Sequence, residues 1–446
     1  MTLKSDNIKQ LNMKFFKNFI LVFSLVLTFG CTKEYEVKTE KVIDEEQNEE
    51  VETVEEPEPF VYFTYNATAL NDSERWIIVY DSDGNLLDYK QDLLEGPMTF
   101  TAHKDSIPEK INITKLSYNK FNDGISEGHR LLTFTDIDDN SVWNDNNYNI
   151  TGNLIGTFNF QVRNITEYEA FQISTPYNIL RPGEFSSESN DNKITLQLTN
   201  IPLYENMEYW INVRGENGRT KFLKLSPANG ESYIHDFNDF LEFDEYVPIN
   251  LPSNQFYILQ SGGFSSNESN TYWGDGQSFS EFFGNGEGMP ENSFLNGYDR
   301  YKFGLGISFI DYSYGYYKIG DKVLDITIPE KPSFTMVSQD IYNLEFVTEL
   351  NPVTKTTRHN SEKTNEEGAY LTTDWEVFST GSKTQQIYEL PNELIERFPN
   401  MELEDLNLNT VILYTQGYEQ QQFFIDKTSK IRTGNYISEN YTFNKF

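Results

Sequence analysis

The stretch Trp76-Ile-Ile-Val-Tyr-Asp-Ser-Asp-Gly84 predicts a β-hairpin, and Trp210-Ile-Asn-Val-Arg-Gly-Glu-Asn-Gly218 repeats its pattern. The Trp, the first Ile, the Val and the last Gly coincide, and Glu74 and Glu208 each stand two residues before the Trp. Each stretch reads as a strand that enters an Asp-Gly or Asn-Gly turn, which is the strongest short-range hairpin signal. We therefore expect a duplicated hairpin, with chance similarity between two unrelated hairpins as the alternative.

Alternation along these two strands predicts which side chains are buried. Successive side chains of a strand point to opposite faces. In the second copy Asn212 and Arg214 should therefore look outward. We expect four residues to lie in cores: Ile77, Val79, Ile211 and Val213.

The composition agrees with an all-β protein. Phe, Tyr and Trp make up 15% of the 446 residues, and aromatic residues favour strands. The best helix candidate is 391–398, where Leu394, Ile395 and Phe398 would share one face. We expect an all-β fold of two or three tandem antiparallel, β-sandwich-like modules after a disordered acidic tether.

The N-terminal segment indicates export. Lys14 and Lys17 precede an apolar run over 19–30, which is shorter than the roughly 20 residues that span a bilayer. A positive flank, a short apolar core and a small residue before a cleavage point are typical of a signal peptide. The n-region begins at Met1 or at Met13. Cys31, the only cysteine in the chain, follows directly.

The sequence around Cys31 resembles that of Bacteroidota surface-exposed outer-membrane lipoproteins. Leu27-Thr-Phe-Gly-Cys31 resembles a lipobox, although Thr28 and Phe29 differ from its usual residues. Thr32-Lys-Glu-Tyr-Glu36 resembles the acidic export signal that follows the lipidated cysteine in such proteins. The resemblance implies lipidation at Cys31, membrane attachment through that lipid anchor, and display on the outer membrane facing the outside of the cell.

The sequence divides into segments of different composition. Residues 32–59 hold twelve Asp or Glu and three Lys, a composition that favours disorder and extension. The expected organisation is a signal peptide over 1–30, an acidic tether over 31–59, and β modules over 60–152, 153–330 and 331–446, with a Gly- and aromatic-rich insertion over 262–300 in the second.

One acidic stretch is a candidate calcium site. Asp136, Asp138 and Asn140 place oxygen atoms at alternate positions, as at the start of a calcium loop. The pattern then departs from that loop, because Ser141 stands where Gly is needed and Asn147 where a bidentate Glu is expected. Calcium binding by another geometry is one interpretation, and a polar loop between strands is the other.

The insertion supplies the candidate ligand site. It contains eight Gly and eight aromatic residues in 39 positions, and a long loop in a compact domain is usually functional or disordered. Tyr272, Trp273 and Asp275 combine aromatic rings with a carboxylate, as in sites that grip a sugar. The alternative is that Trp273 and Phe282 pin the loop to its own sheet. The alternating tyrosines Tyr312, Tyr314 and Tyr316 instead predict one face of a strand.

Charge and motifs restrict the function. The formal net charge of −34 argues against nucleic-acid binding, which needs clustered Lys and Arg. The sequence contains none of the common zinc-protease, nucleophile-elbow or phosphate-loop motifs. We favour a non-catalytic binding, adhesion or assembly module whose ligand is a glycan or a partner protein. An extracellular hydrolase with scattered carboxylates and a structural envelope lipoprotein are the alternatives.

Overall fold

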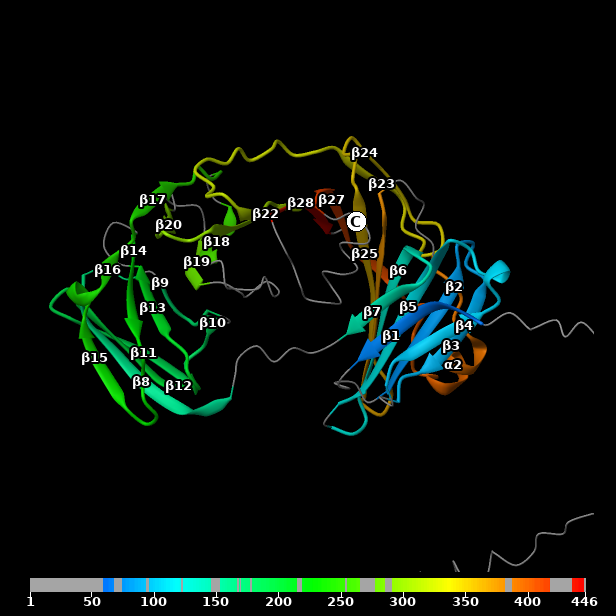
Figure 1. Cartoon of the computed structure of the whole chain (residues 1–446), viewed down its shortest axis with the longest axis horizontal. Coiled ribbons are helices and arrows are strands. Elements are labelled where there is room, and N and C mark those ends of the chain that lie inside the picture. The colour runs from blue at the N-terminus through cyan, green and yellow to red at the C-terminus, as the bar shows by residue number, and fades with distance from the viewer. Residues whose placement is uncertain are drawn as a thin grey trace, which may run out of the picture. The chain divides into compact units, whose positions relative to one another are not determined.

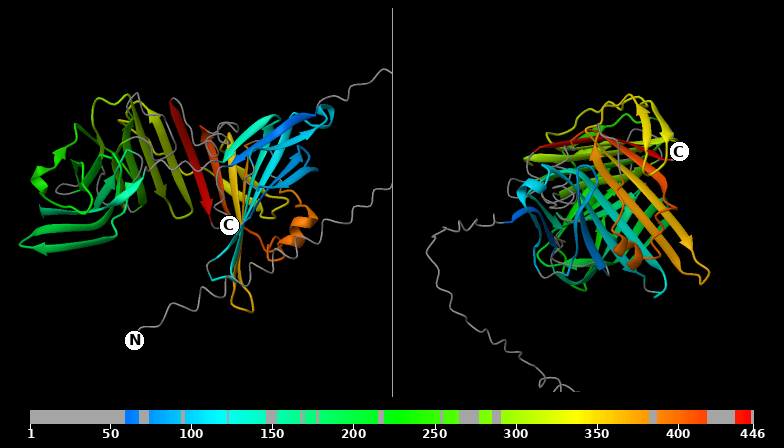
Figure 2. Two further views of the ribbon diagram at one scale, coloured as in Figure 1. Left: turned by 60° about the horizontal axis from the view of Figure 1, so that its bottom comes forward. Right: turned by 90° about the vertical axis from the view of Figure 1, so that its right-hand side faces the viewer.

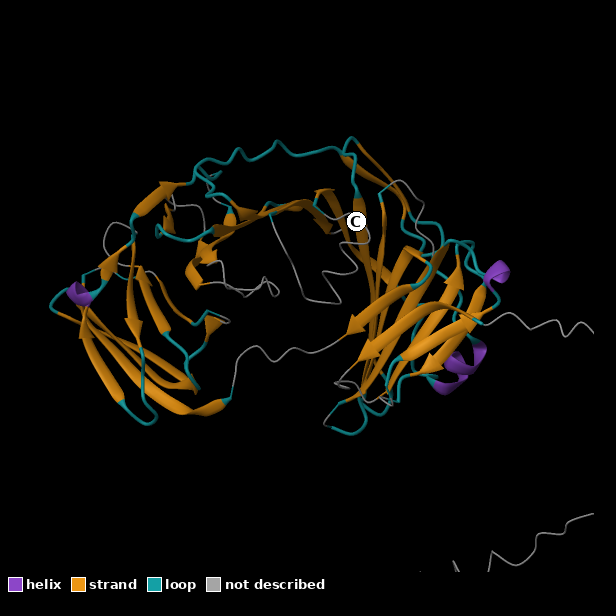
Figure 3. Ribbon diagram, in the orientation of Figure 1, coloured by secondary structure: helices purple, strands orange, loops and turns teal. Residues whose placement is uncertain are grey.

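The computed structural model of the chain is almost entirely β, which confirms the expected fold class (Figure 3). Strands form several sheets, and the helices are short. The structure describes the following residues: 59–67, 74–93, 96–121, 123–145, 153–166, 168, 170–176, 179–214, 219–252, 255–264, 277–284, 291–381, 387–417 and 435–444.

The largest element is a twelve-stranded sheet with the order β19-β18-β21-β22-β28-β27-β25-β26-β6-β5-β2-β3. Neighbouring strands within this sheet are antiparallel, except that β26 and β6 run parallel. In the left view of Figure 2 the red strand β28 lies beside the yellow-green strand β22, although the two are far apart in sequence. The strands are β2 (Glu74–Asp81), β3 (Leu86–Gln91), β5 (Lys110–Lys120), β6 (Glu127–Asp138), β18 (Phe256–Phe264), β19 (Gln277–Gly284), β21 (Arg300–Ser308), β22 (Tyr312–Gly320), β25 (Thr354–Thr364), β26 (Tyr370–Thr380), β27 (Asn407–Gln416) and β28 (Tyr436–Asn444).

Strands from all three expected modules pair within this sheet. β6 lies in 60–152 and pairs with β26 of 331–446. β22 lies in 153–330 and pairs with β28 of 331–446. The division of the chain into three separate modules stays a prediction.

Around β2, β5 and β6 both faces of the large sheet are covered (Figure 1). On one face, Ile77 and Val79 pack with Phe63, Phe100 and Trp143 of a small sheet. On the other face, apolar side chains of helix α2 (Asn392–Arg397) and its flanks complete the core. The small sheet has the order β4-β1-β7 and is built from β1 (Phe60–Ala67), β4 (Met98–Ala102) and β7 (Ser141–Asp145).

The helix corrects one expectation. Leu394 and Phe398 are buried, but Ile395 is 42% exposed. The helix is short. Leu394 and Phe398, which are four positions apart, face the core against which it packs.

The described residues within 154–242 form two packed sheets around a separate core that includes Phe160, Ile173, Leu196 and Ile211. One sheet has the order β10-β9-β13-β14-β16 and the other β11-β12-β8-β15. The strands are β8 (Leu154–Ile165), β9 (Ala170–Ser174), β10 (Ile179–Leu180), β11 (Glu184–Asn190), β12 (Lys193–Tyr204), β13 (Tyr209–Arg214), β14 (Thr220–Leu225), β15 (Ser232–Asp236) and β16 (Leu241–Glu242).

Two two-stranded sheets and two 3-10 turns complete the described structure. Phe334, on the first strand of one of these two-stranded sheets, stacks on Phe443 of β28 with ring centroids 4.0 Å apart. The remaining elements are β17 (Glu245–Pro248), β20 (Glu291–Phe294), β23 (Phe334–Ser338), β24 (Glu345–Thr348), η1 (Lys104–Ser106) and η3 (Phe237–Asp239).

The repeated sequence pattern corresponds to a repeated structure. Ile77, Val79, Ile211 and Val213 all have 0% exposure, which confirms the predicted core positions. The shared glutamates have one role in both copies. The Trp76 indole N–H donates to Glu74 at 2.6 Å, and the Trp210 indole N–H donates to Glu208 at 2.9 Å.

The second copy also corrects an expectation. Asn212 does not look outward but is 2% exposed. Its side-chain amide donates to the Gln172 side chain at 3.2 Å and to the Phe279 carbonyl of β19 at 2.9 Å. Both faces of β13 are therefore covered, because the face opposite the 154–242 core packs against the large sheet.

Candidate functional site

The two faces of strand β21 carry different side chains. Phe303, Leu305 and Ile307 point to one face and join a large buried core. Gly304 and Gly306 alternate with them, so the opposite face has no side chains at these two positions. We call the face with these glycines the glycine face and the other the packed face.

Neighbouring strands extend the same difference. Gly306 pairs with Gly315 of β22, and Gly304 pairs with Tyr317. On the packed face Tyr312 and Tyr314 are buried, which confirms that the alternating tyrosines form one face of a strand. Three glycines thus come together on two adjacent strands, the third and fourth of the twelve in the large sheet.

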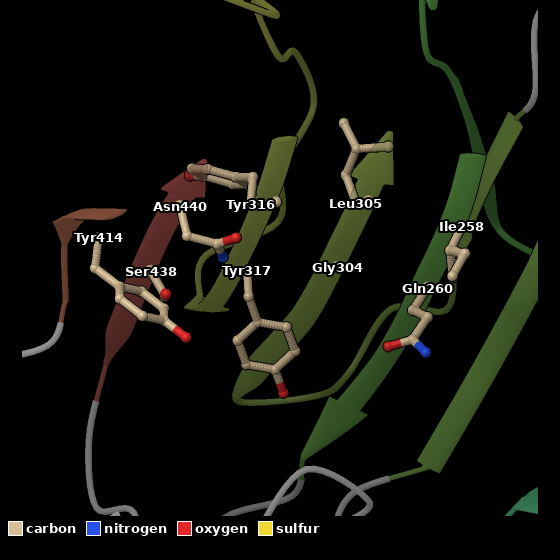
Figure 4. A pocket seen from close by; sticks show the side chains of 11 residues that line it. Ile258, Gln260, Gly304, Leu305, Tyr316, Tyr317, Tyr414, Ser438 and Asn440 are labelled. Atoms are coloured by element: carbon tan, nitrogen blue, oxygen red, sulfur yellow. The ribbon is translucent and has the colours of Figure 1, made fainter. Parts of the chain in front are cut away.

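These glycines form the floor of a groove of about 320 Å³. Figure 4 shows the rings of Tyr317 and Tyr414 and the amides of Gln260 and Asn440 arranged around it. The groove crosses five strands, and we call it the glycine groove. Leu305 and Tyr316 line it while their side chains point to the packed face. The described lining residues are Ile258, Gln260, Gly304, Leu305, Gly306, Gly315, Tyr316, Tyr317, Tyr414, Ser438 and Asn440.

Side chains of the outer strands reach over two of the glycines. A Cβ placed on Gly315 would lie 2.7 Å from Nδ2 of Asn440. A Cβ placed on Gly304 would lie 3.2 Å from Oε1 of Gln260 and 3.4 Å from the Tyr317 ring. Glycine at these positions therefore lets the amide groups lie close to the sheet.

Gly306 is different, because the space above it is open. Among the described residues, a Cβ at Gly306 would meet only the Cβ of Ile258 within 4 Å, at 3.9 Å. This is ordinary van der Waals contact, so packing does not require glycine here. The open floor at Gly306 lies between the amides of Gln260 and Asn440, which can both donate and accept hydrogen bonds.

A second hollow on the same sheet is charged. The Arg358 guanidinium donates to Glu376 at 3.0 Å, and Arg130 lies 3.7 Å from the same carboxylate. Asp374 stands two residues from Glu376 and shares its face of β26. Burial raises the pKa of Asp374, Arg130 lowers it, and the nearby carboxylates raise it further. The hollow has a volume of about 350 Å³.

The charges of this cluster largely satisfy one another. Glu376 is 12% exposed at its side chain and is contacted by both arginines, which are 63% and 51% exposed. Such a set of paired charges is common on the solvent face of a sheet. A carboxylic acid beside an ionised carboxylate is also the minimal equipment of a hydrolase that uses two carboxyl groups.

The predicted calcium residues lie at the end of β6 and in the turn after it. The Thr380 hydroxyl donates to Asp136 at 3.1 Å, and Lys110 pairs with Asp138. The backbone N–H of Asn140 donates to the backbone carbonyl of Tyr62 at 2.6 Å. In the part of the chain that the structure describes, no three His, Cys, Asp or Glu side chains are grouped as a metal site would need. Calcium binding stays a prediction.

The other predicted site residues lie outside the described residues. These are Cys31, the proposed lipidation site, and Tyr272, Trp273 and Asp275 of the insertion. Their proposed roles stay predictions.

Sequence reasoning missed the glycine groove, although a signal was present. Gly304 and Gly306 follow the period of two that defines one face of a strand. A strand glycine often marks a place where another group approaches the backbone closely. The partners Gln260 and Asn440 could not be found in this way, because they join the groove only through the register of the sheet.

No family model, curated protein or solved structure matches the chain. Among the residues covered by the structure, no helix is both long and apolar enough to cross a bilayer. The function is therefore inferred from the geometry of the glycine groove and from the N-terminal sequence.

Proposed function

We propose that this protein is a lipid-anchored cell-surface module that binds a glycan or a partner protein without catalysis and holds it in the glycine groove. One observation supports the groove above the other hollows. Gly306 leaves an open floor that packing does not require, between two amide side chains and next to aromatic rings. A binding site is typically a concave surface with apolar walls and a few placed polar groups.

The anchoring part of the proposal depends on the N-terminal sequence. Acyl chains on Cys31 would hold the protein on the outer membrane, and the acidic tether would separate the folded part from the anionic surface. Two or more chains give stable attachment, because each buried CH₂ contributes about 0.8 kcal/mol.

Mass spectrometry of the mature N-terminus tests this anchoring. The expected product begins at Cys31 and carries acyl chains. Protease added to intact cells should then release the folded part by cutting within about residues 40–59. An unmodified Cys31 would contradict the anchor, and full protection in intact cells would contradict surface display.

Binding is tested on intact cells that display the wild type, Gly306→Val or Ser308→Val. Ser308 is exposed on the same strand and the same face but does not line the groove, so it is a matched control. Labelled glycans and candidate cell-surface proteins are offered to each strain. Capture should be lost in Gly306→Val and kept in Ser308→Val. Equal capture by all three strains would contradict the groove as the binding site.

A hydrolase is the second candidate, and the cluster around Asp374 is the observation that favours it. Asp374, whose pKa is raised by burial, would be the general acid, and Glu376 would be the nucleophile or base. Polysaccharide hydrolysis by the wild type that disappears in both Asp374→Asn and Glu376→Gln would replace the non-catalytic proposal.

A further inference from the structure

We infer that the glycine groove takes an uncharged saccharide, with one face of a sugar ring lying over Gly306. This inference rests on the proposed binding function and names the class of ligand. It depends on the charge, hydrogen-bonding capacity, shape and strand pairing of the groove.

Charge is the first property. None of the eleven lining residues that the structure describes is charged. The chain as a whole carries a formal net charge of −34, which repels anions. Recognition of a carboxylate or a sulfate normally uses Arg or Lys, and the groove lining supplies neither. A neutral ligand is therefore favoured over uronate-containing or sulfated glycans.

Hydrogen-bonding capacity is the second property. Gln260 and Asn440 carry side-chain amides that both donate and accept. A sugar hydroxyl also donates and accepts, so an amide can form two complementary bonds with a pair of neighbouring hydroxyls. Within the described part of the chain, the Asn440 amide forms no hydrogen bond, although it lies close above Gly315. It is therefore available to a ligand.

The shape of the floor is the third property. The open space above Gly306 is flat, because Gly306 and its partner Gly315 contribute only backbone on this face. Ile258 lies beside it, and Tyr414 contributes an aromatic ring to the lining. The C–H face of a sugar ring is apolar and flat, and it would cover this floor while its hydroxyls point to the amides. The groove volume of about 320 Å³ is near the lower end for small-molecule sites, which range over roughly 300–1,000 Å³.

The pairing of the strands disfavours a peptide at this place. Peptides commonly bind a sheet by adding a strand to its free edge. β21 is already paired with β18 and β22, and β22 is paired with β21 and β28. The backbone at the groove floor therefore has no free edge to offer, and side chains must carry the recognition.

Affinity electrophoresis through gels that contain a polysaccharide tests the inference. Neutral probes are xylan, mannan and β-glucan, and anionic probes are polygalacturonate and chondroitin sulfate. The full mature lipoprotein is run in detergent. At least one neutral probe should retard the wild type, and this retardation should change little between low and high salt, because no ion pair contributes.

Variants connect the retardation to the groove. Asn440→Ala removes one amide and should weaken binding about fivefold to tenfold, as the loss of one hydrogen bond predicts. Gly306→Val should abolish retardation, and Ser308→Val should leave it unchanged. Melting temperatures of the variants establish that each is folded.

The outcomes separate this inference from the proposed function. Salt-sensitive retardation by anionic probes, or capture of a protein with no retardation by any neutral probe, would overturn the saccharide inference. If Gly306→Val abolished that capture, the groove would still be a binding site. Retardation by neutral probes that is unchanged in both Gly306→Val and Asn440→Ala would overturn the groove itself.

Discussion

Two regions of the twelve-stranded sheet use their faces differently. Around β2, β5 and β6 both faces are filled, with Ile77 and Val79 on one side and Ile78 and Tyr80 on the other. Around β18, β21, β22 and β28 the packed face is filled in the same way, but the glycine face has no side chains at Gly304, Gly306 and Gly315. One sheet therefore combines a region built for stability with a region whose surface is left open.

Packing requires glycine at some positions of this sheet but not at others. At Gly315 and Gly304 a Cβ would crowd the side chains of the neighbouring strands, whereas at Gly306 there is room for one. Packing does not require a glycine at position 306, and a larger residue would strengthen the strand. The presence of glycine there therefore indicates that the empty space above it has a function. The following predictions test the contrast between the two regions, from the largest expected effect on stability to the smallest.

The largest effect should come from Arg75, which lies in the filled region. Its guanidinium donates to the Tyr65 hydroxyl at 2.9 Å and to Asp92 at 3.2 Å, and both Arg75 and Asp92 are about 95% buried. Arg75→Met would leave a buried carboxylate without this partner and should cost about 3–5 kcal/mol of unfolding free energy. Chemical denaturation measures the change.

A surface ion pair gives the control for Arg75. Lys331 pairs with Asp311 at 2.7 Å, and both side chains are more than half exposed. Lys331→Met should therefore change the unfolding free energy by less than about 1 kcal/mol. Equal effects of the two substitutions would mean that the Arg75 network does not stabilise the filled region.

The next effect concerns the repeated hairpins. Ile77→Ala and Ile211→Ala each remove a fully buried side chain and should each cost about 2–5 kcal/mol. Ser82→Ala, in the exposed turn of the first hairpin, should cost little. Thermal and denaturant unfolding measure all three variants. A loss below about 1 kcal/mol for either isoleucine would show that its side chain is not packed in a core.

The third effect depends on pH and concerns His359 on β25. The side chain is 1% exposed, and burial lowers the pKa of His359 to about 4. Below the usual His pKa of about 6.5 the unfolded chain takes up a proton that the folded chain refuses, so stability falls as the pH decreases from 6.5 towards 4. The loss should approach about 3 kcal/mol at pH 4, since each unit of pKa difference corresponds to about 1.36 kcal/mol.

His359→Gln should remove this part of the pH dependence while leaving the other titrating groups in place. Unfolding free energies at several values between pH 4 and pH 7.5 measure the two slopes. If wild type and variant have the same slope, His359 is accessible to protons in the folded protein and the packed face is looser than the structure shows.

The sequence predicted the filled regions better than the open one. Alternation alone found Ile77, Val79, Ile211 and Val213, because side chains two residues apart in a strand point to the same face. It failed at Asn212, since the partner Phe279 that covers this side chain lies in another sheet and leaves no mark in the local pattern.

The open region was hidden for a related reason. The floor at Gly306 and Gly315 is visible as spaced glycines once the register of β21 and β22 is known. Asn440 enters the groove from β28, which is distant in sequence, so no local pattern could connect it to Gly315. Long-range register, rather than local propensity, assembles the candidate site.

The smallest expected effect on stability comes from Gly306→Val, which also tests most directly whether the open floor serves binding. A β-branched residue suits a strand, and the position that a Cβ would occupy is free, so the unfolding free energy should stay the same or rise by up to about 1 kcal/mol. Unfolding and ligand binding are measured together on the variant, with Ser308→Val in parallel. We predict unchanged or higher stability with binding lost. A fall of more than about 2 kcal/mol with binding retained would contradict this role and make Gly306 a packing residue.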